Sequence, residues 1–403
     1  MEQEASLLLP TYERFPILFE RGEGVHLYDV NGRAYLDFLS GIGVNALGYA
    51  HPEVQKTICE QAGKLIHISN LFYHEYQAKL AAKLTKLSGM DRAFFSNSGT
   101  EAWEGALKLA RAYAKHVAKD GVEPKWRFLM MLNSFHGRTY GSLSTTGQTK
   151  YQAPFAPNLP GIDFVTFNDV ADLKAKFDDT VCAIGLEAIQ GEGGIQVISE
   201  EFITTARELT MKSGALLIVD EIQAGLGRTG KYFAYQNFAV KPDIVTLAKP
   251  IAGGLPLGAI LVTNEVSAAF HPGMHGTTFG GGPLACATAV KVLEIIERDR
   301  ILDHVVAVGA YFQQKLNELK AKHNAVVKVR ALGLMVGIEL NSIDLAKAAV
   351  REMLEKGIII NRTHDVVLRF LPPFVIEKGH VDQVVTALDE ILAANAKAAG
   401  GSK

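Results

Sequence analysis

The chain has 403 residues, with 41 Lys or Arg against 43 Asp or Glu, and a formal net charge of −2 at pH 7. This balance argues against nucleic-acid and membrane-surface partners, because both require a concentrated basic face. Cys59, Cys182 and Cys286 form neither a CxxC pair nor a zinc-ligand spacing, which argues against a disulfide framework and a structural metal site.

The N-terminal residues are acidic where a signal peptide would be basic, and no stretch approaches the roughly 20 apolar residues needed to cross a bilayer. We therefore expect a cytoplasmic protein that spans no membrane. Its length favours two or three domains. We expect an N-terminal segment over residues 1–50 that packs with a small domain, a large domain over 51–290, and a C-terminal small domain over 291–403.

From about His51, helical segments alternate with short apolar strands. In the helix expected over 100–115, apolar side chains recur at helical spacing. Strands are expected at 92–96, 128–132, 164–167, 181–187, 216–220, 244–248 and 260–263. This alternation predicts an α/β fold with a large, mostly parallel sheet covered on both faces. Beyond about Leu284, a long helical stretch, strands at 330–340, 357–361 and 366–370, and a final helix from Gly379 predict a smaller α+β domain.

Three polar residues lie at the carboxyl ends of predicted strands: Glu187, Asp220 and Lys249. Ligands of open parallel sheets bind beyond these strand ends. Asp220 and Lys249 are far enough apart for one crossover between parallel strands, so both can face the same crevice. Taken alone, Lys249 would be interpreted as a surface lysine and Asp220 as a helix cap or surface acid.

The combination of an acid and a lysine has a specific chemical use. A desolvated lysine can be a neutral amine and form a Schiff base with an aldehyde. A carboxylate beside a pyridine nitrogen keeps that nitrogen protonated, so that the ring accepts electrons. These roles would place both groups around one aromatic ring.

A phosphate site is also predicted. The segment 94–100 runs from a strand into a helix and puts Ser98, Gly99 and Thr100 at the helix N-terminus, where free N–H groups and the helix dipole favour an anion. The alternative is simple N-capping by Ser98 or Thr100. After another strand end, Phe135 offers a face for a planar ring and Arg138 a partner for a carboxylate.

Seven motifs together resemble the class III pyridoxal-phosphate-dependent aminotransferases, in that family's order and spacing. They are Asn97-Ser-Gly-Thr-Glu-Ala102, Phe135-His-Gly-Arg-Thr139, Gln190-Gly-Glu-Gly-Gly194, Asp220-Glu-Ile-Gln223, Gly227-Arg-Thr-Gly230, Leu247-Ala-Lys249 and His275-Gly-Thr-Thr-Phe-Gly-Gly281. The resemblance runs from about Tyr12 to the last helix. It is strongest to the acetylornithine aminotransferase branch, which serves arginine and lysine biosynthesis, and it implies the fold type I of pyridoxal-phosphate (PLP) enzymes.

The resemblance implies a role for each matching residue. Lys249 would hold PLP as a Schiff base and shuttle a proton, and Asp220 would pair with the ring nitrogen. The remaining cofactor contacts would come from Ser98, Gly99, Thr100, Phe135, Glu187 and Gln223, joined by Thr278 of a second subunit. A site completed by a neighbouring chain implies a homodimer at least.

For the substrates, the resemblance implies a two-stage (ping-pong) transfer from an ω-amino acid, such as acetylornithine, to 2-oxoglutarate. Arg138 would bind the α-carboxylate of the donor and Arg369 that of 2-oxoglutarate. Glu192 would neutralise Arg369 while a donor occupies the site, because an unpaired buried arginine is costly. Tyr12 and Thr277 are further candidate substrate contacts.

The sequence departs from the family at four positions. Trp103 stands where relatives usually have a smaller residue, and either narrows the pocket or packs in the core. Ala188, Ala224 and Pro250 replace the usual Pro, Thr and small flexible residue. These changes leave the donor open, with succinylornithine, a carrier-bound lysine precursor and 4-aminobutyrate as alternatives to acetylornithine.

Other classes of protein fit the sequence less well. Gly225-Leu-Gly227-Arg-Thr-Gly230 fits the GxGxxG pattern of nicotinamide enzymes, but Asp220-Glu-Ile-Gln-Ala224 stands between it and the apolar residues of the preceding strand. His271 and His275 have metal-ligand spacing, but Pro272 and Gly273 break the helix that would align them. A non-catalytic descendant would usually have lost Lys249 or Asp220. Within the family, an aminomutase using the same residues is the alternative to a transaminase.

Overall fold

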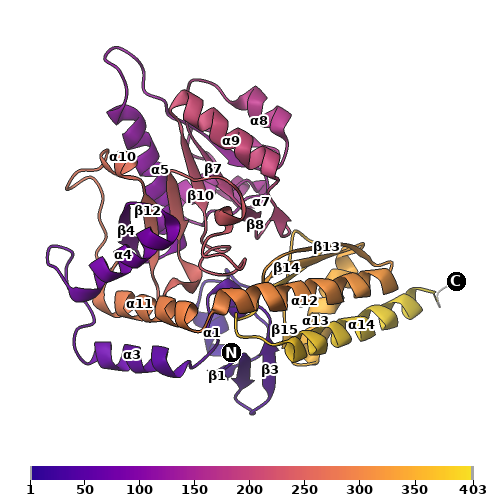
Figure 1. The fold of residues 1–403 in the computed structure, drawn as a ribbon. Coiled ribbons are helices and arrows are strands. Elements are labelled where there is room, and N and C mark those ends of the chain that lie inside the picture. The colour runs from indigo at the N-terminus through magenta and orange to yellow at the C-terminus, as the bar shows by residue number, and fades with distance from the viewer. Residues whose placement is uncertain (1, 401–403) are drawn as a thin grey trace.

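The computed structural model describes residues 2–400. A large sheet sandwiched by helices forms one part of the molecule, and a smaller group of helices and strands from the C-terminal third lies beneath it (Figure 1). None of the helices within residues 2–400 has the length and apolar character needed to cross a membrane.

The large sheet has seven strands in the order β4-β12-β11-β10-β7-β5-β6. Neighbouring strands are parallel except at β12, which runs antiparallel to both β4 and β11. The mostly parallel sheet is thus confirmed. The strands are β4 (Arg92–Ser96), β5 (Arg127–Met131), β6 (Ile162–Val165), β7 (Val181–Glu187), β10 (Leu216–Asp220), β11 (Ile244–Leu247) and β12 (Gly258–Val262).

Both faces of this sheet are buried, because alternate side chains of its strands point to opposite sides. On one face, Met130 and Ile218 pack with α5 (Gly99–His116). On the other face, Met131 and Val219 pack with helices that include α4 (Glu75–Ser88) and α9 (Glu200–Ser213). This double burial explains why the strands are continuous apolar runs in the sequence.

Shorter elements connect these strands. They are α6 (Tyr140–Thr145), α7 (Thr149–Gln152), η1 (Ala153–Phe155), α8 (Val170–Lys176), β8 (Ile189–Gln190), β9 (Gln196–Val197), η2 (Ala234–Asn237), η3 (Lys249–Ala252) and α10 (Asn264–Ser267).

The C-terminal third begins with α11 (Pro283–Arg298) and α12 (Ile301–Lys322). A four-stranded sheet in the order β13-β14-β17-β16 follows. Its strands and the remaining elements are β13 (Val326–Leu332), β14 (Met335–Leu340), α13 (Ile343–Glu355), β15 (Ile358–Ile359), β16 (Asn361–Thr363), β17 (Val367–Phe370) and α14 (Lys378–Gly400).

Two strand predictions in this region are wrong. The strand expected over 330–340 is a hairpin of β13 and β14, which turns at Gly333 with a φ of +58°. The strand expected over 357–361 is divided between β15 and β16, which belong to different sheets. In the first case Leu332 and Leu334 flank the turn glycine, and in the second Ile360 continues the apolar run from one strand toward the next, so each segment resembles one strand in the sequence.

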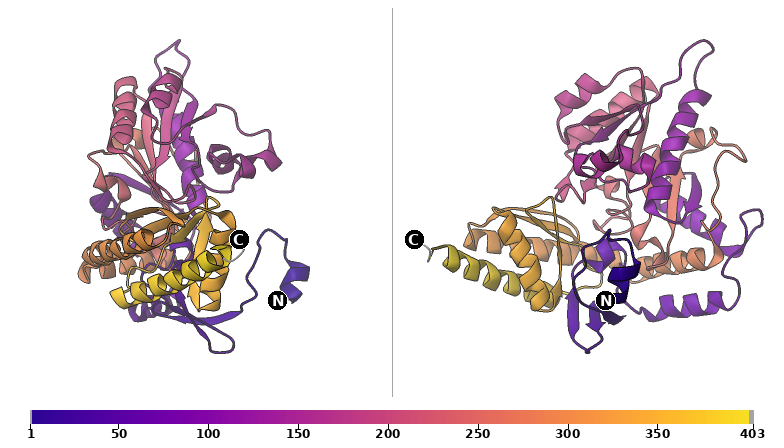
Figure 2. Two further views of the ribbon diagram at one scale, coloured as in Figure 1. Left: turned by 90° about the vertical axis from the view of Figure 1, so that its right-hand side faces the viewer. Right: turned by 180° about the vertical axis from the view of Figure 1, so that it is seen from behind.

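The N-terminal residues form α1 (Glu2–Leu7), β1 (Phe19–Glu23), β2 (His26–Asp29), β3 (Ala34–Asp37), α2 (Ser40–Gly43) and α3 (Pro52–Ala62). α1 stands away from the body of the molecule on an extended stretch of chain (Figure 2). β3 pairs with β15, and Leu36 and Phe38 pack in one core with side chains from residues 292–392. α11, which contains residue 290, contributes Leu293 to the core of the large sheet and Ile296 to this second core.

Candidate active site

A cavity of about 290 Å³ lies at the carboxyl ends of β7, β10 and β11. Its walls join residues from widely separated parts of the sequence. They are Gly99, Thr100, Phe135, His136, Gly137, Arg138, Glu187, Glu192, Asp220, Ile222, Gln223, Ala248 and Lys249. The strand ends thus bring Lys249 and Asp220, the predicted lysine and acid, to the same cavity.

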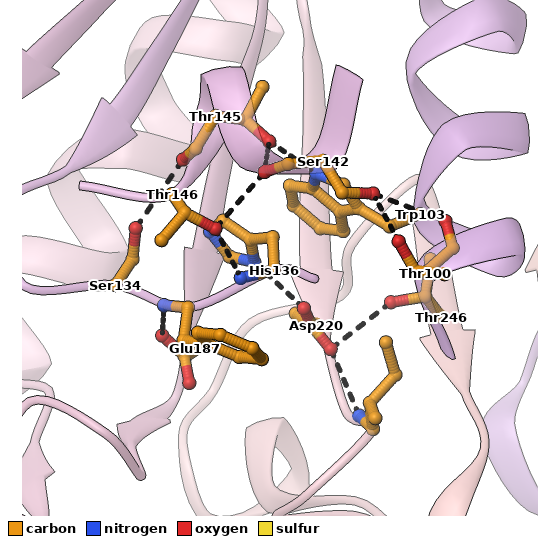
Figure 3. Close-up of polar contacts among 12 residues, drawn as sticks. Thr100, Trp103, Ser134, His136, Ser142, Thr145, Thr146, Glu187, Asp220 and Thr246 are labelled. Atoms are coloured by element: carbon orange, nitrogen blue, oxygen red, sulfur yellow. Dashed lines mark hydrogen bonds and ion pairs between the residues drawn. The ribbon is translucent and has the colours of Figure 1, made fainter. Parts of the chain in front are cut away.

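Asp220 is the last residue of β10 and is only 4% exposed. Three donors surround its carboxylate: His136 through Nδ1 at 2.7 Å, the backbone N–H of Ile222 at 3.0 Å and the hydroxyl of Thr246 at 3.3 Å (Figure 3). A buried carboxylate needs such donors in place of water. The cavity is therefore lined by a carboxyl group that is held in a fixed orientation.

Glu187 lies beside Asp220, since the two residues are paired in register at the ends of β7 and β10. The Glu187 carboxylate accepts hydrogen bonds from the backbone N–H of Phe135 at 3.0 Å and of Gly191 at 3.4 Å. Burial, reinforced by the charge of Asp220, raises the pKa of Glu187 well above its usual value. Two neighbouring buried carboxyl groups disfavour carrying two charges, and the raised pKa favours the protonated form of Glu187.

Lys249 begins η3, two residues after the end of β11. Burial among protein atoms lowers the pKa of its amine, and the charge of Glu192 acts in the opposite direction. A lowered pKa increases the neutral, nucleophilic fraction of the amine. Pro250 is compatible with this geometry, because it stands in the first turn of η3, where a missing N–H costs nothing.

The start of α5 forms another wall of the cavity. Ser98 is the N-cap, and its hydroxyl accepts from the backbone N–H of Glu101 at 3.3 Å. Ala102 donates the first intrahelical backbone bond, to Ser98, so the N–H groups of Gly99 and Thr100 precede the helical ladder. Ser98 itself does not line the cavity, which agrees with the capping alternative for its side chain.

Arg369 lies on β17 and is only 1% exposed, so its guanidinium is buried. Its Nη1 donates to Glu192 at 2.5 Å, to the carbonyl of Gly191 at 3.2 Å and to the side chain of Gln223 at 3.3 Å. The expected Arg369–Glu192 pair is therefore present. The charge of Arg369 also lowers the pKa of Glu192, against the effect of burial.

Arg138 is exposed at the cavity wall, with its guanidinium 4.0 Å from the centre of the Tyr151 ring and 5.7 Å from that of Phe135. No acidic residue in the described part of the chain forms an ion pair with it. Its charge is thus available to an anionic group at the cavity mouth.

Besides Ser98 and Arg369, which adjoin the cavity without lining it, three candidate residues lie outside it. Tyr12 is 77% exposed in the segment before β1. Thr277 and Thr278 line a separate, larger hollow of about 780 Å³. Thr277 also accepts a hydrogen bond from Asn97 at 3.1 Å, so it touches the loop that precedes α5.

No role is predicted from the sequence for His136 or Ile222, although both stand within the motifs shared with the family. His136 contacts Asp220, and Ile222 lines the cavity two residues after it. The position of each immediately beside a predicted site residue was the available signal. Trp103 does not narrow the cavity; it is fully buried and stacks on His136.

Comparison with known proteins gives a consistent result. The profile of the family described as Aminotransferase class-III matches residues 9–392. An acetylornithine aminotransferase from Methanocaldococcus jannaschii is 47% identical over 97% of each chain. One from Aquifex aeolicus is 47% identical over 96% of this chain and 99% of its own. A solved ornithine aminotransferase from Toxoplasma gondii, with PLP partially occupying its active site, has a TM-score of 0.91 and 32% identity and covers 98% of this chain and 94% of that one.

Proposed function

This chain belongs to the class III aminotransferases, and from that membership we propose that it moves the terminal amine of an acetylornithine-like donor to 2-oxoglutarate with PLP as cofactor. The observation that carries the proposal is the meeting of Lys249 and Asp220 in one cavity. One group supplies an amine and the other a carboxylate, and Gly99 and Thr100 at the start of α5 line the same cavity.

The residues present fit PLP. Gly99 is needed for the close approach of α5 to the cavity wall, because a Cβ there would meet Cγ2 of Ile222 at 2.8 Å. The N–H groups of Gly99 and Thr100 suit a phosphate at a helix N-terminus. The side chains of Phe135 and Ile222 line the same cavity and are suited to an aromatic ring. Gln223 supplies an amide for the ring hydroxyl.

When bound, PLP supplies an electron sink for the breaking of a bond at the substrate carbon that bears the amine. Lys249 would bind the cofactor covalently, and its amine, once released, would carry the proton between that carbon and the C4′ carbon of the cofactor. Asp220 would keep the ring nitrogen protonated. The raised pKa of Glu187 favours its neutral form, which would leave the negative charge beside the ring nitrogen to Asp220.

The two arginines divide the work of substrate recognition. Arg138, at the open side of the cavity, would bind the α-carboxylate of the donor, whose reacting amine is at its far end. Arg369 would bind a carboxylate of 2-oxoglutarate after Glu192 moves away from it. While Glu192 remains paired with Arg369, the two charges cancel. The part of the donor next to its terminal amine has no carboxylate, so it would not leave Arg369 as an unpaired buried charge.

We further propose that two copies of the chain form a dimer in which Thr278 of each copy binds the phosphate in the other's site. Thr278 is exposed and lines the 780 Å³ hollow, away from Lys249 of its own chain. The nearby side chains of Leu71, Tyr73 and Phe279 are 87%, 102% and 67% exposed. Large apolar side chains gathered on one surface favour a protein interface.

A panel of amino donors tests the proposed reaction. Purified protein loaded with PLP is given acetylornithine, succinylornithine, ornithine or 4-aminobutyrate, each with 2-oxoglutarate, and glutamate is measured. We expect acetylornithine to give the highest kcat/KM. If glutamate forms fastest from 4-aminobutyrate, that compound and not acetylornithine is the preferred donor. Isomerised donor without glutamate would identify an aminomutase, and no product from any donor would contradict the proposal.

A further inference from the structure

Trp103 is a fully buried side chain on α5, one turn after the helix start that faces the cavity. Its indole lies parallel to the imidazole of His136, with ring centres 3.9 Å apart and an angle of 5° between the planes (Figure 3). The indole N–H donates to the hydroxyl of Thr145 at 2.8 Å, which fixes the ring in its own plane. Trp103 is absent from the cavity wall, so it would touch neither cofactor nor substrate.

His136 connects this indole to Asp220. Its Nδ1 lies 2.7 Å from the Asp220 carboxylate, and its backbone N–H donates to Thr146 at 2.9 Å. Nε2 is buried and has no hydrogen-bond partner among the described residues. The carboxylate and the ring stack are therefore the contacts that hold the imidazole, and a tilt of its plane would bring it into the indole.

A glycine in β7 leaves space for the indole of Trp103. Gly185 lies in the middle of β7, where a glycine normally weakens a strand. A Cβ at Gly185 would lie 3.0 Å from Cη2 of Trp103 and 2.6 Å from the sulfur of Met130. The large residue on α5 and the missing side chain on β7 are thus complementary. The indole of Trp103 therefore fits closely into the space between α5 and β7.

We propose that Trp103 is a positioning residue for the cofactor: by covering one face of His136 it keeps Nδ1 directed at Asp220 and water away from that hydrogen bond, so that Asp220 stays oriented toward the ring nitrogen of PLP. The inference rests on the proposed function, because it assigns that partner to Asp220. A hydrogen bond shielded from water is stronger than the same bond in contact with it.

The experiment measures two properties of PLP bound to the protein, its dissociation constant and its absorption spectrum, without any turnover. His136→Leu removes the donor, and we expect PLP to bind about tenfold to hundredfold more weakly, as expected for the loss of a hydrogen bond to a charged group. His136→Asn, which can place an amide N–H near the position of Nδ1, should recover part of this loss. Trp103→Leu should weaken PLP about threefold to tenfold, the range for loss of an aromatic pair, and Trp103→Phe should weaken it less.

The spectrum separates positioning from general destabilisation. Protonation of the ring nitrogen depends on the carboxylate beside it, so we expect Trp103→Leu and His136→Leu to change the absorption band of bound PLP in the same direction. The matched control is Leu109→Ala, which opens the same buried cluster of α5 away from the cavity and should leave the band unchanged. In a His136→Leu background, Trp103→Leu should have no further effect on PLP affinity, because the indole acts through the imidazole.

Equal spectra and affinities for wild type and Trp103→Leu would overturn the inference, as would effects of the two substitutions that simply add. If Trp103→Leu does not fold, the comparison of Trp103→Phe, His136→Leu and their double variant decides in the same way. Failure of the wild-type protein to bind PLP would instead contradict the proposed function itself.

Discussion

The guanidinium of Arg369 is held 2.5 Å from the carboxylate of Glu192, inside the protein and beside the cavity that contains Lys249. The acid side chain is 23% exposed, whereas the arginine is 1% exposed. Glu192 is therefore the partner that can move. The proposed switch would move the side chain of Glu192, which lines the cavity, and leave β17 with Arg369 in place.

Glu192→Gln should increase the affinity for 2-oxoglutarate. The substitution removes the carboxylate that competes with the substrate for Arg369, and a change of about 1.4 kcal/mol corresponds to roughly tenfold in affinity. Steady-state assays in which the concentration of this acceptor is varied measure the effect as a lower Michaelis constant. Glu339→Gln is the matched control, because Glu339 pairs with Arg330 in the same sheet outside the cavity. A Michaelis constant that rises in Glu192→Gln and not in the control would contradict the switch.

Capture of PLP should become faster as the pH rises, with a midpoint below 10.5, the pKa of an unperturbed lysine. The reason is that burial lowers the pKa of Lys249, and only its neutral amine can attack the aldehyde. Glu192→Gln should move the midpoint further down, because the charge of Glu192 raises that pKa. The rate is measured by absorbance after mixing apoprotein with PLP. A midpoint at or above 10.5, or an upward shift in the variant, would contradict a lowered pKa of Lys249 and the effect of Glu192 on it.

Arg138→Ala should lower kcat/KM for donors that carry a free carboxylate by about tenfold to hundredfold. This is the range for loss of a charge-assisted hydrogen bond. Simple alkylamines should be used by wild type and variant with similar efficiency. Lys150→Ala serves as control, because Lys150 lies 4.9 Å from the same Tyr151 ring that Arg138 covers. Equal losses for carboxylated donors and simple amines would exclude a carboxylate-binding role.

Hybrid dimers test whether Thr278 acts in the other subunit. In one hybrid, Lys249→Ala and Thr278→Ala are carried by the same chain. The remaining Lys249 is then on the wild-type chain, and the neighbouring chain lacks Thr278. In the second hybrid the two substitutions are on different chains, so the remaining Lys249 faces an intact Thr278. We expect PLP to bind more weakly, by about tenfold, only in the first hybrid. Weaker binding only in the second hybrid would place Thr278 in its own chain's site.

The strands that build the cavity could be predicted from the sequence. The segments 181–187 and 216–220 match β7 and β10 to the residue, because they are apolar runs that end abruptly in an acid. The rule that ligands bind at the carboxyl ends of parallel strands then selected Glu187, Asp220 and Lys249. These three residues do line one cavity.

Other features could not be obtained in this way. A buried strand is the same apolar run whether it is parallel or antiparallel, so the direction of β12 was not predicted. The contact between His136 and Asp220 joins positions 84 residues apart, and no local periodicity encodes it. The burial of Arg369 likewise depends on Glu192 and Gln223, which come from the other side of the cavity.

The most direct test of the account is to map the residue that binds PLP covalently. The protein is incubated with PLP, reduced with borohydride to make the linkage permanent, digested and examined by peptide mass spectrometry. We predict that the label is on Lys249 and that Lys249→Ala protein is neither labelled nor active, while Asp220→Asn protein is still labelled but turns over far more slowly. A label on another lysine, or full turnover by Lys249→Ala, would contradict the central claim.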